Sequence, residues 1–166
     1  MRLNLREIIN IPGQSVSFDY EPDVADMRFE SVMDTVSPLR AVGTIVNEAG
    51  VLKLRAHLSA ELICQCARCL TEFPYSFSYD AEAVIAEEQF DEDNFDIFLL
   101  DGDYIDVDEV IVTAYVLNME QRFLCREDCK GLCDKCGKNL NEGPCDCKAE
   151  TDPRLAVLGQ LLEKKD

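Results

Sequence analysis

The segment 51–65, VLKLRAHLSAELICQ, alternates between apolar and polar side chains along nearly its whole length. Successive side chains of a β-strand point to opposite faces, so this period of two predicts a long strand with one buried face and one solvated face. Ile63 is the main exception to the alternation. A strand of this kind favours an antiparallel sheet that covers a core with one face only. The apolar face consists of Leu52, Leu54, Ala56, Leu58, Ala60, Leu62 and Cys64.

Neighbouring segments supply partners for this strand. The run LRAVGTIVN at 39–47 precedes it across the turn residues EAG, and the two runs together predict a β-hairpin. After a turn at 67–70, the segment EFPYSFSYDAEAVIAEE predicts a third antiparallel strand. The earlier piece SVSFDYEP predicts a further short strand.

The apolar period changes from strand-like to helical after residue 105. Asp106, followed three residues later by Glu109, has the form of a capping box, which predicts the start of a helix. The apolar stripe of this helix is Val107, Val110, Ile111, Ala114 and Leu117. A second helix is predicted for TDPRLAVLGQLLEKK near the C-terminus, where Thr151 or Asp152 serves as the cap and Pro153 suits the first turn. Its stripe is Leu155, Leu158, Leu161 and Leu162.

These elements predict an α+β fold: an antiparallel β-sheet with one packed helix, a cysteine-rich zinc knuckle insert and a C-terminal helix. We expect residues 1–124 to form the α+β core. Residues 125–166 would form a cysteine-rich zinc-binding segment with the C-terminal helix, packed on that core, so that the chain is a single domain overall.

Composition indicates a soluble globular protein, with 47% hydrophobic and 30% charged residues among 166. No stretch approaches the roughly 20 apolar residues that cross a bilayer. The start MRLNLREIIN lacks the apolar core of a signal peptide. We therefore expect a cytoplasmic protein without a membrane partner, and in that reducing compartment nine cysteines favour metal binding over disulfides.

Four of the cysteines form one compact set, Cys133 and Cys136 in a C-x2-C pair and Cys145 and Cys147 in a C-x-C pair. The turn-rich sequence GKNLNEGP between the pairs can fold back and bring them together. Four thiolates at this spacing predict a structural zinc site.

A second set is completed by cysteines far apart in the sequence. Cys125 and Cys129 share one side if their segment is helical, and the C-x2-C pair Cys66 and Cys69 ends the long predicted strand. Joining these four predicts a second structural Zn²⁺ per chain that pins the end of the sheet to the segment after the helix. Cys64 then remains as a small buried residue of the core.

Two other uses of the cysteines stay open at this point. In one, Cys125, Cys129, Cys133 and Cys136 form a single site and leave the C-x-C pair as a reducing thiol. In the other, Cys66 and Cys69 are a redox pair, although only Arg68 is at hand to stabilise a thiolate and no thioredoxin-like pattern surrounds them.

Charge is the second strong signal, because 33 acids against 16 basic residues give a net charge of −17. The 53 residues from Cys69 to Gln121 contain fifteen acids and no Lys or Arg. The pattern fits either a solvated face with an acidic loop around EEQFDEDNF or a docking surface for a basic protein.

Catalytic motifs are scarce, and we do not expect an enzyme. His57, the single histidine, falls on the polar face of the predicted strand and is expected at the surface. The sequence contains no nucleophile elbow, no H-E-x-x-H and no P-loop. A zinc held by four thiolates has no open position for water, which indicates a structural metal.

Several of these motifs resemble one family. CARCLTEF after a long strand, then CKGLCDKCGKNLN, CDC and DPRLAVLGQLL in this order, are similar to the bacterial YceD family of large ribosomal RNA subunit accumulation proteins. The resemblance spans about residues 40–162. It implies a non-enzymatic role in the synthesis, processing or stability of large-subunit (23S) ribosomal RNA and in ribosome assembly. The cysteines that fit the family pattern are Cys66, Cys69, Cys129, Cys133, Cys136, Cys145 and Cys147, with Cys125 fitting more loosely and Cys64 an extra.

Composition favours a protein partner within that role. The local basic residues Arg122, Arg126, Lys130, Lys135, Lys138 and Lys148 are diluted by Glu127, Asp128, Asp134, Glu142 and Asp146. No aromatic stacking platform accompanies them, so direct contact with ribosomal RNA is the weaker hypothesis. We expect the acidic surface between Glu72 and Glu120 to bind a basic ribosomal protein or another assembly component. The alternatives are a zinc-ribbon adaptor that binds nucleic acid and a CxxC thiol redox protein.

Overall fold

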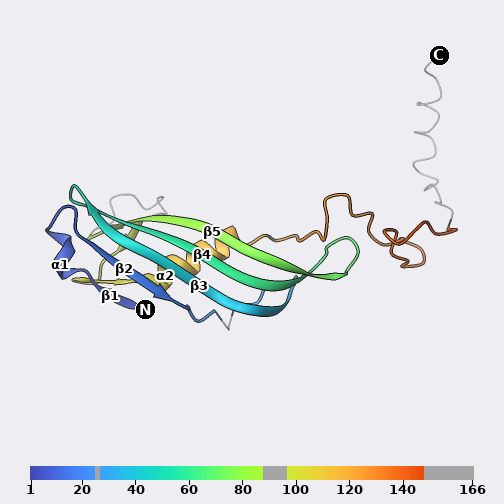
Figure 1. The fold of residues 1–166 in the computed structure, drawn as a ribbon, viewed down its shortest axis with the longest axis horizontal. Coiled ribbons are helices and arrows are strands. Elements are labelled where there is room, and N and C mark those ends of the chain that lie inside the picture. Colours follow the sequence, from blue (N-terminus) through green and yellow to red (C-terminus); the bar gives the residue numbers. More distant parts are fainter. Residues whose placement is uncertain (25–26, 88–96, 148–166) are drawn as a thin grey trace, which may run out of the picture.

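A computed structural model of the chain describes residues 1–24, 27–87 and 97–147 (Figure 1). The elements in chain order are β1 (Arg2–Asn4), α1 (Arg6–Ile9), β2 (Ser15–Tyr20), β3 (Val32–Glu48), β4 (Val51–Gln65), β5 (Glu72–Ala86), β6 (Ile97–Leu99), β7 (Tyr104–Asp106) and α2 (Val107–Asn118). The main sheet has the strand order β2-β3-β4-β5-β6, and β1 pairs with β7 in a small second sheet. The fold is therefore mostly sheet with a few helices.

The predicted hairpin is the centre of the main sheet. β3 and β4 pair antiparallel up to Glu48 and Val51, and Ala49 and Gly50 between them have φ values of 54° and 96°. Two residues with positive φ give a connection whose twist matches that of the strands, as in type I′ turns. β3 is longer than the predicted run and begins at Val32. β5 pairs antiparallel with β4, and β2 with β3, so the other two predicted strands are also confirmed.

The inner face of β4 forms the core as the alternation predicts. All seven side chains of the predicted apolar face are buried, with exposed fractions of 6% or less. Because a slip of one residue would expose all of them, at about 1.5–3 kcal/mol for each large side chain, this pattern fixes the register of the sheet.

The sheet is mixed rather than purely antiparallel, which corrects the sequence prediction. β6 pairs parallel to β5 through Val84↔Ile97 and Ala86↔Leu99. The small β1–β7 sheet and helix α1 were not predicted either. β1, β6, β7 and α1 have three or four residues each, and such short segments show no recognisable apolar periodicity in the sequence.

Helix α2 lies across the inner face of the sheet (Figure 1). Its N-cap is Asp106, whose side chain accepts a hydrogen bond from the Asp108 N–H, so the predicted start is confirmed. The predicted stripe is wrong at Leu117, which is 71% exposed. Tyr115 is buried instead and meets the Phe77 ring edge-on, with 5.0 Å between ring centroids.

The predicted C-terminal helix at 151–165 and most of the acidic loop at 87–95 lie outside the described residues. Within the described residues, no helix has the length and apolar character needed to span a membrane.

Candidate metal centres

The first cysteine pair lies in the tight turn that joins β4 to β5. The Cys66 N–H donates to the carbonyl oxygen of Thr71, and the Leu70 N–H donates to that of Cys66, both over 2.9 Å. Leu70 adopts a φ of 58°, which closes the turn. This geometry places Cys66 and Cys69 side by side, and both are buried.

The second pair arrives on the segment that leaves α2. Figure 1 shows this segment passing the β4–β5 turn and continuing beyond the end of the sheet. The Ala67 N–H donates to the Phe123 carbonyl oxygen over 2.8 Å, and Arg68 Nη1 donates to the carbonyl oxygen of Cys129 over 2.9 Å. The Arg68 carbonyl oxygen in turn accepts from the Leu132 N–H over 3.1 Å. Hydrogen bonds before and after Cys125 and Cys129 therefore fix the segment to the turn.

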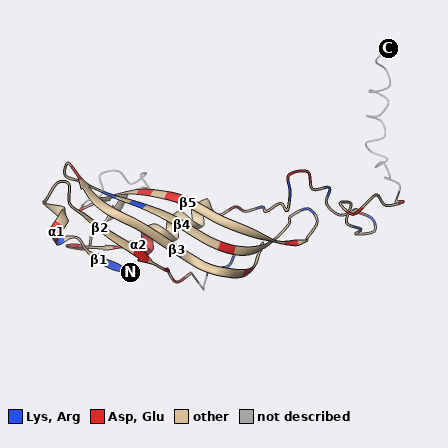
Figure 2. Cartoon of the chain, viewed as in Figure 1, with Lys and Arg blue, Asp and Glu red and all other residues tan. Residues whose placement is uncertain are grey.

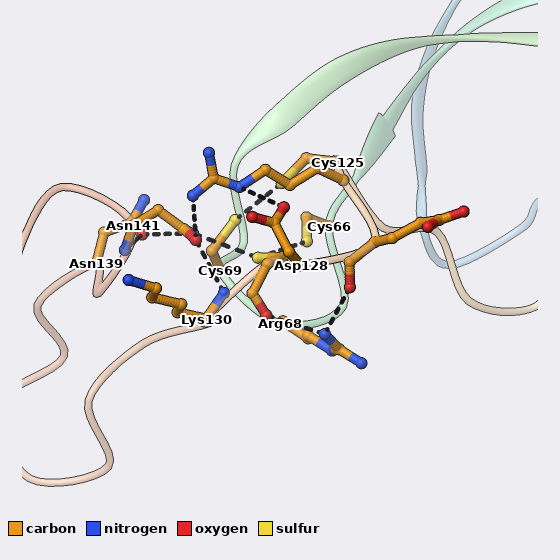
Figure 3. Close-up of polar contacts among 11 residues, drawn as sticks. Cys66, Arg68, Cys69, Cys125, Asp128, Lys130, Asn139 and Asn141 are labelled. Carbon is orange, nitrogen blue, oxygen red and sulfur yellow. Dashed lines mark hydrogen bonds and ion pairs between the residues drawn. The ribbon is translucent and has the colours of Figure 1, made fainter.

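Four sulfurs meet at this junction (Figure 3). Cys66 Sγ lies 3.8 Å from Cys129 Sγ, and Cys69 Sγ lies 3.7 Å from Cys125 Sγ. All four lie within 4.8 Å of one another. A tetrahedral zinc site with Zn–S bonds of about 2.3 Å has S···S edges of about 3.8 Å, so the spacing fits a tetrahedral metal site. We call this set the first centre.

The segment that carries Cys125 and Cys129 is formed by bends and turns, not by a helix. The helical spacing considered from the sequence is therefore not the reason that these two sulfurs meet. Their positions follow instead from the hydrogen bonds that the segment makes with Arg68.

The compact set Cys133, Cys136, Cys145 and Cys147 forms the second centre, and its sulfurs also lie within 4.8 Å of one another. The Gly137 N–H donates to the Cys133 carbonyl oxygen over 2.9 Å, and Gly137 adopts a φ of 70° that favours glycine. Lys138 Nζ donates to the Pro144 carbonyl oxygen over 2.8 Å and draws the C-x-C arm toward the C-x2-C arm.

The cysteines of the first centre differ in acidity. Burial works to raise the pKa of Cys66, but backbone hydrogen bonds from Cys125, Cys69 and Arg68 stabilise its thiolate and lower the pKa to about 6. Burial, followed by hydrogen bonds among the neighbouring thiols, raises the pKa of Cys125 to about 12. The backbone donors therefore favour a thiolate at Cys66, whereas burial and the neighbouring thiols disfavour one at Cys125.

The second centre shows the same separation. Backbone hydrogen bonds from Cys136 and Lys135 lower the pKa of Cys133 to about 7. A hydrogen bond with Cys136, together with burial, raises the pKa of Cys147 to about 12. Crowding of like charges in each set opposes full ionisation, and a bound dication would offset it.

Asn141, in the loop between the two cysteine pairs of the second centre, contacts the first centre (Figure 3). Asn141 Oδ1 accepts from the Lys130 N–H over 2.8 Å and from Arg126 Nη2 over 2.6 Å. Backbone groups add to the link, since the Leu140 N–H donates to the Gly131 carbonyl oxygen over 2.9 Å. Asn141 and the two-sided hydrogen bonding of Arg68 were not predicted, because a turn-rich sequence signals only that the chain folds back.

Cys64 is fully buried in the main core, and burial raises the pKa of its thiol to about 11. Its prediction as a core residue is confirmed. The nine sulfurs therefore form two groups of four, and the sulfur of Cys64 belongs to neither group. The alternative single cluster of Cys125, Cys129, Cys133 and Cys136 does not form, because the first two and the last two belong to different centres.

The predicted acidic region is distributed over β5, β7 and α2 (Figure 2). Asp80 Oδ1 lies 2.7 Å from Nδ1 of His57, which is exposed on the outer face of β4 as predicted. Glu82 pairs with Arg55 over 3.1 Å. On the other sheet, Asp101 pairs with Arg2. Some of these acids therefore meet cations from outside the region 69–121.

Residues 54–162 match the family model described as large ribosomal RNA subunit accumulation protein YceD. The chain is 26% identical over 172 residues to the uncharacterized protein YlbN of Bacillus subtilis (strain 168), covering 100% of this chain and 99% of that protein. It is 29% identical over 145 residues to an uncharacterized protein of Mycobacterium tuberculosis (strain H37Rv), covering 82% of this chain and 60% of the relative.

A shorter match joins the chain to a plant protein. It is 39% identical over 61 residues to the large ribosomal RNA subunit accumulation protein YCED homolog 1, chloroplastic, of Arabidopsis thaliana, covering 36% of this chain and 19% of that protein. No solved structure matches the chain. Because the family model covers more than half of the sequence, the chain belongs to the YceD family of large ribosomal RNA subunit accumulation proteins.

Proposed function

We propose that this protein is a non-enzymatic cytoplasmic factor in the accumulation of large-subunit ribosomal RNA, and that it acts by binding a basic ribosomal or assembly protein. The match of residues 54–162 to the family carries the ribosomal RNA role. The net charge of −17 favours a basic protein over a phosphate backbone as the direct contact.

Each centre holds one structural Zn²⁺ in this proposal. The support is the S···S spacing of 3.7 and 3.8 Å in the first centre and the chemistry of four thiols with no other ligand type. Zinc bound by four thiolates is closed to substrate and water, which is why we propose a scaffold rather than an enzyme. Each such site carries a formal charge of −2, so the loaded protein has a charge of about −21.

In the proposed single domain, the first centre links the β4–β5 turn to the segment that follows α2. Two of its cysteines lie in the turn between β4 and β5, and two lie in the segment that follows α2. Metal binding in small domains supplies folding free energy on the order of 10 kcal/mol. We infer that zinc in the first centre fixes the segment that carries Cys125 and Cys129 to the β4–β5 turn.

Metal content and thiol reactivity test the zinc part of the proposal. Two zinc ions per chain are expected, with one thiol, that of Cys64, reacting only after unfolding. A thiol redox protein would instead show little zinc and reversible oxidation of Cys66 and Cys69. About one zinc with five free thiols would contradict the division into four, four and one.

Depletion of the protein in cells tests the function itself. The ratio of large-subunit to small-subunit ribosomal RNA is expected to fall and to recover when the wild-type chain is expressed again. Crosslinking in cells, with identification of both proteins and RNA, then names the contact. Recovery of ribosomal RNA with no ribosomal or assembly protein would contradict the proposed protein partner. It would favour the alternative function, that of an adaptor that binds nucleic acid.

A further inference from the structure

One edge of the main sheet is open along most of β5. β5 pairs with β4 at fourteen consecutive positions, from Glu72 to Ile85, without a register shift. On its other side only Val84–Ala86 pair, with β6. In the described part of the chain, residues 72–83 therefore have no strand on that side. A regular edge of this length presents backbone N–H and carbonyl groups that can pair with another strand.

The opposite side of the sheet offers a poorer template. β2 pairs only with residues 41–46 of β3, so the first half of β3 is also an edge. Register shifts interrupt its pairing with β4 between Val32 and Asp34, and twice more before Arg40. This half also contains Pro38, which has no N–H to donate. Bulges and proline are the usual means of protecting an edge, and β5 has only Pro74.

A small groove of about 60 Å³ lies between β5 and α2. Leu117, the residue that the sequence placed in the core, lines this groove with 71% of its surface exposed. The apolar part of its lining is Ala81, Ala83, Phe98, Val110, Ala114 and Leu117, and the polar part is Tyr79, Glu82, Thr113 and Asn118. A strand added beside β5 would direct alternate side chains toward this inner side.

The other face of the same edge is acidic. Glu72, Asp80 and Glu82 alternate with the inward residues of β5, and the side chains of Asp80 and Glu82 are 87% and 74% exposed. Figure 2 shows β5 and α2 with acidic residues, and the sequence has no Lys or Arg from 69 to 121. Glu82 pairs with Arg55 of β4 over 3.1 Å, whereas Asp80 lies 2.7 Å from His57, which is charged only when protonated. The remaining side chains of an added strand would therefore meet carboxylates.

We propose that the β5 edge binds an extended basic segment of a protein partner by strand addition. Apolar residues of the segment enter the groove beside α2, and alternating Lys or Arg residues lie against Asp80 and Glu82. This inference rests on the proposed function, which requires a basic partner, and it adds the surface and the mode of binding.

Charge also selects against a second copy of this chain as the occupant. Pairing two β5 edges would bring the outer acids of one copy near those of the other, and opposed like charges destabilise a strand pair. Each chain also carries a net charge of −17.

A labelled short peptide of alternating Lys and Val tests the proposal, with binding to the zinc-loaded protein followed by fluorescence anisotropy. Binding should weaken as salt rises. The same peptide with alternate backbone amides N-methylated keeps its charges but loses strand hydrogen bonds. It should bind about 30-fold more weakly or worse, because it loses several backbone hydrogen bonds to β5.

Matched variants locate the site. Asp80→Lys and Leu117→Ser should each weaken binding at least about fivefold, the first by charge reversal and the second by loss of an apolar contact. Asp34→Lys and Val36→Ser make the same changes on the irregular edge of β3, where Val36 is 67% exposed, and should leave the affinity unchanged. All four positions are exposed, so melting temperatures check that each variant is folded.

Three results would overturn the inference. Equal affinity for the plain and N-methylated peptides would show charge attraction without strand addition. A homodimer that the Asp80 and Leu117 variants dissociate would assign the edge to a second copy. Labelled ribosomal RNA that competes with the peptide and responds to the same variants would assign it to RNA. Zinc content and the ribosomal RNA ratio are measured separately, so failure here is distinguishable from failure of the proposed function.

Discussion

The side-chain amide of Asn141 donates a hydrogen bond to Cys129 Sγ over 3.3 Å, so a residue of the second centre's loop contacts a ligand of the first. This hydrogen bond is the main cause of the lowered pKa of Cys129. Partners of this kind orient metal ligands and tune their basicity. The Asn141 side chain therefore couples the two centres directly.

Replacing Asn141 should weaken the first centre. Asn141→Asp removes the donor and places a carboxylate beside a thiolate, so the zinc affinity of the first centre should fall about 10–100-fold, as for other outer-shell ligand partners. Competition with a chromogenic chelator measures the change. Asn118→Asp on α2, where the amide donates to the Ala114 carbonyl oxygen, is the control and should leave both affinities unchanged.

Cys64 near the end of β4 and Cys66 in the turn that follows should respond differently to loss of the sulfur. Cys66→Ser should reduce the zinc content from two to one, because Cys66 belongs to the first centre. Cys64→Ala should keep two zinc ions and lower the free energy of unfolding by about 1 kcal/mol through loss of buried volume. Metal analysis and urea unfolding report the two effects. Loss of zinc from Cys64→Ala would show that Cys64 is a ligand.

Zinc binding should release protons and strengthen with pH. At about pH 8, Cys125 and Cys147, with pKa values of about 12, are protonated without metal, and each must lose its proton to become a ligand. Cys66 and Cys133, with pKa values of about 6 and 7, are already thiolates and release none. We expect at least one proton released per centre, measured by calorimetry in buffers of different ionisation enthalpy. An affinity that does not change with pH would contradict this assignment.

Removal of the metal should loosen the junction between the β4–β5 turn and the segment after α2 while the sheet stays folded. Hydrogen exchange should accelerate at the Ala67 and Leu132 amides, which join the β4–β5 turn to the segment after α2. Amides in the middle of β4, such as that of Leu58, should stay protected because β3 and β5 flank it on both sides. Simultaneous loss of protection at Leu58 would show that the core itself depends on the metal.

Gly43 should be intolerant of a side chain. A Cβ at this position would lie 2.5 Å from the Arg55 carbonyl oxygen and 2.6 Å from Cζ of Phe18. Gly43→Ala should therefore destabilise the protein by about 1–3 kcal/mol, the range for overpacked cores. Thr44→Ala, at the next position on β3, is the control and should cost less than about 1 kcal/mol in urea unfolding.

The sequence predicts most reliably the features that repeat. Alternation along 51–65 predicts which face of β4 is buried, and the turn residues before Val51 predict the hairpin. Spacing also predicts the grouping of the cysteines, because Cys66 and Cys69 need ligands and only Cys125 and Cys129 remain to supply them.

Features decided by packing between distant residues could not be predicted. Helical spacing allows both Tyr115 and Leu117 near the inner face, and contact with the Phe77 ring is what places Tyr115 there. The conformation around Cys125 follows from hydrogen bonds to Arg68, a residue more than fifty positions away. The parallel pairing of β6 likewise depends on a three-residue strand with no period of its own.

Cys66 and Cys129 stand 63 positions apart, whereas all four ligands of the second centre fall between residues 133 and 147. During translation the N-terminal half of the first centre is made long before its partner half, and β5, β7 and α2 are synthesised in between. The second centre takes all four thiols from one short loop, but the first can close only on a chain that has been made through α2 to Cys129. A metal bound in the first centre would thus mark a chain in which every strand of the sheet has already been synthesised.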